Sequence, residues 1–182
     1  MDGMNNLFLD YPLAYLITFT TYGTRLPGEE RGWVHRLQNR YQTPYPTAEP
    51  KLMYAMEARL GECPYTLGAL HRPLVLAAIK EACIYRGWQL EAAHVRSRHI
   101  HSVVGASADP EFVLNTFKSY SSRKLNRAGL DPGRCRRWTR HGSTKYLWTP
   151  ESLAAAIHYV IEEQGDPMSV FRRDRDPSEP RP

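Results

Sequence analysis

The sequence predicts an α+β fold of the ferredoxin-like β-α-β-β-α-β plan, an antiparallel sheet with an additional C-terminal helix. Two observations predict it: three amphipathic stretches carry helix-start and helix-stop residues, and the stretches around them have the pattern of strands. With 182 residues, 42% of them apolar, the chain can form one ordinary domain with a core. We expect a single domain over residues 1–171 and a disordered, charged tail over residues 172–182.

The strands are expected over residues 13–21, 88–95, 99–105 and 144–148. In the first, apolar side chains alternate from Leu13 to Phe19, as in a strand with one buried face. Only three residues separate the second and third, which indicates a hairpin. In this plan the third strand is the central one.

The helices are expected over residues 73–86, 110–128 and 150–164. A proline opens each helix and a glycine follows each one, an asymmetry typical of helix termini. Asp109 and Thr149 are the predicted N-caps of the second and third helices. Between the first strand and the first helix lies a long insertion over residues 25–70, and connections of this length are typically functional or mobile.

Positive charge is concentrated between residues 118 and 145. This window holds nine basic residues and one acidic residue, so its net charge is +8 and the rest of the chain carries −3. Such local excess predicts a polyanion-binding surface, although a solvated surface without a partner remains an alternative. The predicted DNA-binding residues are Arg98, Lys118, Arg123, Lys124, Arg127, Arg134, Arg136, Arg137, Trp138, Arg140 and Lys145. Trp138 and Tyr146 are candidates for stacking on bases.

Two histidines, His99 and His101, are separated by one residue at the start of the predicted central strand. On a strand their side chains point to the same face, as two ligands of one metal ion must. Two ordinary surface histidines would give the same pattern.

Tyr159 lies on the third predicted helix, opposite the apolar stripe that includes Leu153 and Val160. Core packing therefore does not explain it. Ala155 and Ala156 are expected on the same side, where they would leave room for a substrate, and Glu163 shares the Tyr159 face. An exposed aromatic residue at a partner interface is the alternative.

The string from Arg98 to Val104 resembles the His-hydrophobe-His strand of the HUH single-tyrosine transposases. The segment from Tyr159 to Gln164 resembles their nucleophile helix, in which a polar metal ligand follows the tyrosine by one turn. Residues 117–120 are similar to the helix before it. The resemblance covers residues 13–164 and points to the REP-associated tyrosine transposases and related small insertion-sequence transposases.

This resemblance implies a metal-dependent endonuclease and strand transferase that acts in DNA transposition on single-stranded or hairpin DNA. Tyr159 would be the nucleophile and form a 5′-phosphotyrosine, and Mg²⁺ or Mn²⁺ would be held by His99, His101 and Glu163. Helical geometry favours Glu163 as the third ligand, with Glu162 and Gln164 as alternatives. Because the sequence has neither G-x-x-x-x-G-K-[ST] nor G-x-G-x-x-G, we expect no requirement for ATP.

Two other functions fit the same residues: a non-catalytic domain that binds single-stranded nucleic acid, and a metal-dependent hydrolase that uses water. The sequence leaves open whether a homodimer forms and whether Tyr159 serves the histidine pair of its own chain. Three widely spaced cysteines and the lack of a long apolar run near the start predict a cytoplasmic protein that does not contact membranes.

Overall fold

The computed structural model describes residues 11–24, 47, 49–131 and 135–174. The predicted α+β class is confirmed, because an antiparallel sheet of five strands packs against helices. In chain order the described elements are β1 (Ala14–Thr21), α1 (Pro50–Ala58), α2 (His71–Arg86), β2 (Gln89–Val95), β3 (His99–Gly105), α3 (Pro110–Ala128), β4 (Trp138–Leu147), α4 (Pro150–Glu162) and β5 (Ser169–Arg172). None of these helices combines the length and the apolar content that a membrane span needs.

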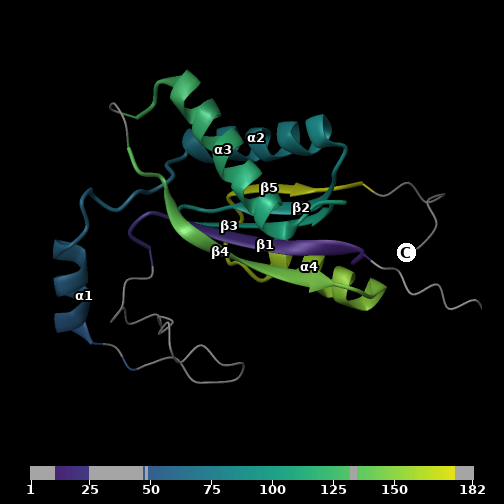
Figure 1. Ribbon diagram of the computed structural model, residues 1–182, viewed down its shortest axis with the longest axis horizontal. Helices are drawn as coiled ribbons and strands as arrows, with labels where there is room; N and C mark the ends of the chain where they lie inside the picture. Colours follow the sequence, from purple (N-terminus) through teal and green to yellow (C-terminus); the bar gives the residue numbers. More distant parts are fainter. Residues whose placement is uncertain (1–10, 25–46, 48, 132–134, 175–182) are drawn as a thin grey trace, which may run out of the picture.

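The strands lie in the order β4-β1-β3-β2-β5, so β3 is central, as predicted (Figure 1). Each neighbouring pair is antiparallel, and β2 and β3 form the expected hairpin. The register places His101 of β3 opposite His94 of β2 on one side and opposite Thr18 of β1 on the other. Directly opposite residues share a face of the sheet, so these three side chains form one row across it.

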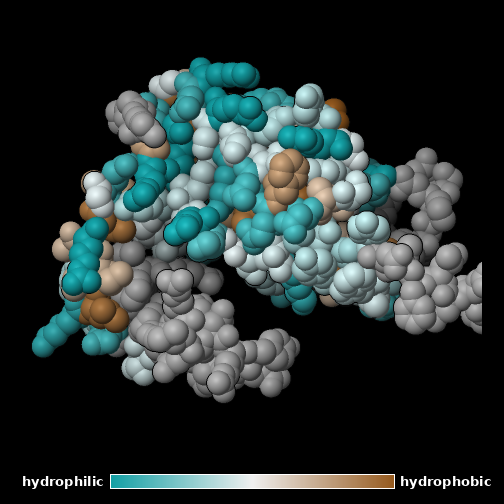
Figure 2. Space-filling model, viewed as in Figure 1, coloured by the Kyte–Doolittle hydropathy of each residue, from teal (hydrophilic) through white to brown (hydrophobic). Residues whose placement is uncertain are grey.

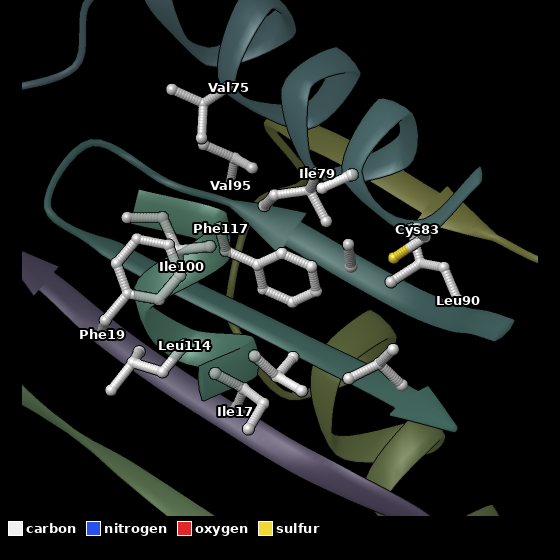
Figure 3. Packing of buried hydrophobic residues seen from close by; sticks show 14 of the residues in the cluster. Ile17, Phe19, Val75, Ile79, Cys83, Leu90, Val95, Ile100, Leu114 and Phe117 are labelled. Carbon is white, nitrogen blue, oxygen red and sulfur yellow. The ribbon is translucent and has the colours of Figure 1, made fainter. Parts of the chain in front are cut away.

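One face of the sheet is covered by α2 and α3 (Figure 1). Figure 3 shows the core between these helices and the sheet, where Ile79 of α2 and Phe117 of α3 point toward Ile17 of β1 and Ile100 of β3. These four side chains are completely buried. Burial of each large apolar side chain contributes roughly 1.5–3 kcal/mol, so this layer provides much of the hydrophobic stabilisation.

The other face is partly covered by α4, which packs mainly on β2 and β3. Leu153, Ala156 and Val160 of α4 are buried together with Val103 of β3. Toward β1 the cover is incomplete, and Thr18 on this face is only half-buried. The sheet therefore keeps an open strip beside α4.

Local capping explains where the helices begin and end. The Asp109 carboxylate accepts hydrogen bonds from the first free backbone N–H groups of α3, and Gly129 follows the helix at φ 62°. The Thr149 side chain starts α4 through a capping box. Helix α2 begins at His71, two residues before the predicted start, because Pro73 is tolerated anywhere in the first turn, where its missing N–H has no helical partner.

Strand β4 is longer than predicted, since it begins at Trp138 and not at residue 144. Residues 139–143 carry polar or small side chains and show no apolar alternation. β4 is an edge strand that pairs only with β1, so most of its side chains remain in solvent. Its sequence therefore lacks the alternation of apolar and polar residues by which a half-buried strand is predicted.

The end of the insertion is part of the core. Leu67 is completely buried, and its backbone N–H donates to the carbonyl of Ser97 in the β2–β3 turn. Most of residues 25–48 lie outside the described ranges, and α1 was not predicted. Near the C-terminus, β5 pairs with β2 and extends through Arg172, the first residue of the predicted tail; residues 175–182 lie outside the described ranges.

Candidate active site

The histidine pair lies on β3, on the sheet face that α4 partly covers. The rings of His99 and His101 are parallel, with centroids 6.3 Å apart and an interplanar angle of 7°. His101 is 6% exposed, and its Nδ1 lies 3.0 Å from the Thr18 hydroxyl oxygen. A metal-binding histidine typically donates from its non-coordinating ring nitrogen to a neighbouring group, and Nδ1 of His101 is placed to donate to this hydroxyl.

Tyr159 comes from α4 and meets His101 edge-on, with ring centroids 5.7 Å apart and an interplanar angle of 89°. The tyrosine is 37% exposed, so it belongs neither to the core nor to the free surface. The structure thus brings together three of the four residues predicted for catalysis and metal binding, all from one chain.

The helix is rotated relative to the expectation. Ala156 is buried against the sheet and leaves no room for a substrate, whereas Ala155 is exposed as predicted. Packing of the small Ala156 side chain lets α4 turn its Tyr159 side toward β3. At 100° per residue, Tyr159 then lies roughly 90° from the centre of the buried set and not opposite it. This places the phenol at the rim between α4 and the sheet.

The predicted third metal ligand lies apart from the pair. Helix α4 ends at Glu162, and Glu163 is its C-cap, with one carboxylate oxygen 3.0 Å from Nδ1 of the exposed His158. Gln164 donates from its amide to the Tyr159 carbonyl at 3.0 Å, and Glu162 is exposed. Within the described ranges, no three His, Cys, Asp or Glu side chains gather closely enough to hold a metal ion.

One functional candidate was not predicted from the sequence: His94, which is completely buried between β2 and α4. Its Nε2 accepts from the Met168 backbone N–H at 3.2 Å, so the proton is on Nδ1, which donates to the Val160 carbonyl at 3.2 Å. Burial lowers the pKa of His94, although the bond to Val160 acts in the opposite direction. The ring therefore links the end of α4, directly after Tyr159, to the segment before β5. The only sequence signal is a histidine within the otherwise apolar stretch 92–95.

Three of the residues predicted to bind DNA, Lys118, Arg137 and Trp138, make contacts inside the fold. The Lys118 ammonium is buried and donates to the carbonyls of residues 139, 140 and 141, and burial lowers its pKa. Arg137 is buried and donates through Nε and Nη2 to Asp131 at 2.9 and 2.7 Å. The Trp138 indole N–H donates to Ser122, and its ring packs on Phe19.

The remaining basic residues differ in their availability. Lys124 forms an ion pair with Glu81, and Arg134 lies outside the described ranges. Six are exposed to solvent: Arg98, Arg123, Arg127, Arg136, Arg140 and Lys145. Figure 2 shows that the surface in the view of Figure 1 is mostly hydrophilic. The positive surface is therefore smaller than the charge count indicated.

No protein-family model matches the chain, and no curated protein matches it. Two of the solved structures that resemble this chain are as follows. One is a REP-associated tyrosine transposase bound to a REP hairpin, with a TM-score of 0.46, 12% identity, and coverage of 90% of this chain and 72% of the other. The second is a candidate transposase from Deinococcus radiodurans R1, with a TM-score of 0.41, 16% identity, and coverage of 90% and 97%. The function proposed below is argued from the residues of this chain.

Proposed function

We propose that this protein is a metal-dependent single-stranded DNA transesterase that acts in DNA transposition through a 5′-phosphotyrosine. The observation that carries the proposal is the Tyr159 ring edge-on to the buried His101 within one chain. The scaffold in this proposal is the ferredoxin-like one, with β4-β1-β3-β2 as its four-strand core and α4 as the nucleophile helix.

Tyr159 would act as the nucleophile. The phenol loses its proton as its oxygen forms a bond to the scissile phosphorus. The bond from phosphorus to the 3′ oxygen breaks, and the 3′ oxygen takes up a proton. The number of phosphate ester bonds is unchanged, so the strand can be rejoined without ATP. A free phenol has a pKa of about 10 and needs activation at neutral pH, which a neighbouring cation would supply.

His99 and His101 would hold the cation, because two imidazoles on one strand face suit a divalent transition metal and tolerate Mg²⁺ or Mn²⁺ when a carboxylate or amide joins them. A cation held by these residues would supply neutralisation of the charge on the scissile phosphate. Glu163 is the proposed third ligand, and Glu162 and Gln164 are its alternatives. Since Glu163 and His158 are both exposed, their mutual contact is a weak competitor for the cation.

The open strip of the sheet beside α4 offers a path for the DNA strand. Lys145 is opposite Leu16 on β1 and therefore lies on the same face as the histidine pair, and its side chain is exposed. Arg98 precedes His99 directly and is exposed at the end of the hairpin. Two cations near the two ends of the strip would position the phosphate backbone.

A non-catalytic domain that binds single-stranded nucleic acid is the second candidate. The observation that favours it is the position of Glu163, which contacts His158 and not the histidine pair. The two functions share the DNA-binding residues and differ only in whether Tyr159 reacts.

The test is to incubate the purified protein with labelled single-stranded DNA from its flanking genomic sequence and Mn²⁺, and to look for an adduct that survives denaturation. We expect Tyr159→Phe to abolish the adduct and His101→Ala to reduce it at least a hundredfold. The control is Tyr54→Phe, an exposed tyrosine on α1 that should leave the yield unchanged.

Each outcome separates the candidates. Cleavage that persists in Tyr159→Phe identifies a hydrolase that uses water. DNA binding without an adduct at any Mn²⁺ or Mg²⁺ concentration identifies the non-catalytic domain. Mixing Tyr159→Phe with His101→Ala restores the adduct only if the tyrosine serves the metal site of a second copy in a homodimer.

A further inference from the structure

The outer side of α2 and α3 carries a set of arginines and aromatic rings, which we name the arginine–aromatic surface. It consists of Tyr85, Arg86, Phe112, Tyr120 and Arg123. These residues belong to the helices that cover the sheet face opposite α4, so the surface is separate from the candidate active site (Figure 1).

The five side chains form a continuous series. The Arg123 guanidinium lies 4.4 Å from the Tyr120 ring centroid, and the Tyr120 and Tyr85 centroids are 6.5 Å apart. The Arg86 guanidinium lies 5.7 Å from the Tyr85 centroid and 5.1 Å from that of Phe112. Stacking on a ring holds a guanidinium by its face and leaves its N–H edge for an acceptor.

Phe112 meets the buried Trp88 edge-on, but packing within the fold leaves much of this series in solvent. Tyr85 is 75% exposed and Phe112 is 47% exposed, so most of the first ring and about half of the second remain in water. Tyr120 is half-buried and packs against the core, and its ring also contacts Arg123 and Tyr85. Exposed aromatic residues that adjoin one another commonly mark an interaction surface.

The charge of the surface is positive. Within the described part of the chain, no carboxylate forms an ion pair with Arg86 or Arg123. The acidic Glu81 on α2 is neutralised by Lys124 of α3. Glu111, beside Phe112, is the acidic residue within the first turn of α3, where the helix dipole favours it.

We propose that the arginine–aromatic surface binds single-stranded DNA outside the active site. Bases would stack on the exposed faces of Tyr85 and Phe112, and phosphates would accept hydrogen bonds from Arg86 and Arg123. Every base has a face that can stack, so such a surface binds without strong sequence preference. The choice of DNA rests on the proposed function, and the bound segment is the part of the substrate strand that lies away from the scissile phosphate.

The test measures equilibrium binding of fluorescein-labelled oligothymidine by anisotropy, without metal and in the Tyr159→Phe background, so no chemistry takes part. We expect Tyr85→Ala to raise the dissociation constant about tenfold. The double variant Arg86→Ala/Arg123→Ala should reduce the slope of log affinity against log salt by about 1.4, because each phosphate contact contributes about 0.7 on single strands. The matched control combines Tyr54→Ala on α1 with Arg59→Ala at the C-cap of that helix, which removes an exposed tyrosine and an exposed arginine.

Unchanged affinity and salt slope in these variants, with the fold intact by circular dichroism, would overturn the inference. So would a change of oligomeric state in Tyr85→Ala by analytical ultracentrifugation, since the surface would then contact a second copy of the chain. The proposed function is tested independently by the covalent adduct. An adduct with unaffected oligothymidine binding refutes only the surface, and impaired binding without any adduct refutes only the chemistry.

Discussion

His94 is the residue whose replacement most directly tests the geometry of the site. Its ring is completely buried and bonds to two backbone groups, the Val160 carbonyl and the Met168 N–H. Val160 is among the last four residues of α4, whose carbonyls have no partner within the helix. The histidine thus donates a hydrogen bond to a carbonyl in the last turn of α4, at the residue directly after Tyr159.

The perturbation is His94→Leu, which introduces an apolar side chain of similar volume and removes both hydrogen bonds. A buried backbone group left without a partner costs roughly 1–3 kcal/mol, and water can reach the half-buried Met168 bond more easily than the Val160 carbonyl. We expect the free energy of unfolding to fall by about 3 kcal/mol, which lowers the melting temperature by about 9 °C in a chain of this size. We also expect the Tyr159 adduct to decrease, because the end of α4 is no longer held.

The assay is thermal and urea denaturation followed by circular dichroism at pH 7, with His141→Leu as control because that side chain is exposed. His94→Gln should recover part of the loss, since an amide can donate to one backbone group and accept from the other. A His94→Leu protein that melts within 2 °C of the unchanged chain, or above it, would show that the two bonds do not stabilise the fold.

Three other changes have definite expected outcomes. Asp131→Asn should lower the free energy of unfolding at pH 7 by about 3 kcal/mol, because it leaves Arg137 buried without its carboxylate. Burial alone raises the pKa of Asp131, but hydrogen bonds from Arg137 and other donors hold the pKa below its usual value. The stability from this ion pair is therefore present above pH ~4 and is lost as the pH falls. Acid titration of unfolding should show a smaller pH dependence in the variant. Lys118→Met should destabilise by about 2 kcal/mol in urea melts, yet leave the oligothymidine affinity of the folded protein unchanged. Gly142→Ala should destabilise β4 and weaken its pairing with β1, because the new Cβ would lie 2.6 Å from the Thr18 carbonyl oxygen. We expect faster hydrogen exchange of the backbone amides in β1. Unchanged exchange would contradict this prediction.

Local patterns predicted most of the helices and strands of the sheet, although α1 and the first half of β4 were missed. Asp109 and Gly129 delimit α3 at the residues that their capping chemistry predicts, and alternation over residues 13–21 identifies β1 within one residue. The same alternation requires His99 and His101 to share a face, because the period of a strand is two wherever it lies in the sheet. These features depend on neighbours within a few positions along the chain, so the sequence contains all the information they need.

Contacts between distant segments were decided by the tertiary structure. Lys118 is basic in the sequence, but in the fold its ammonium is buried and donates to three carbonyls of β4. The rotation of α4, which buries Ala156 and brings Tyr159 to His101, follows from how its small side chains fit β2 and β3. A helical pattern specifies which residues share a stripe, whereas the angle of that stripe to the sheet depends on the shape of the surface it packs against.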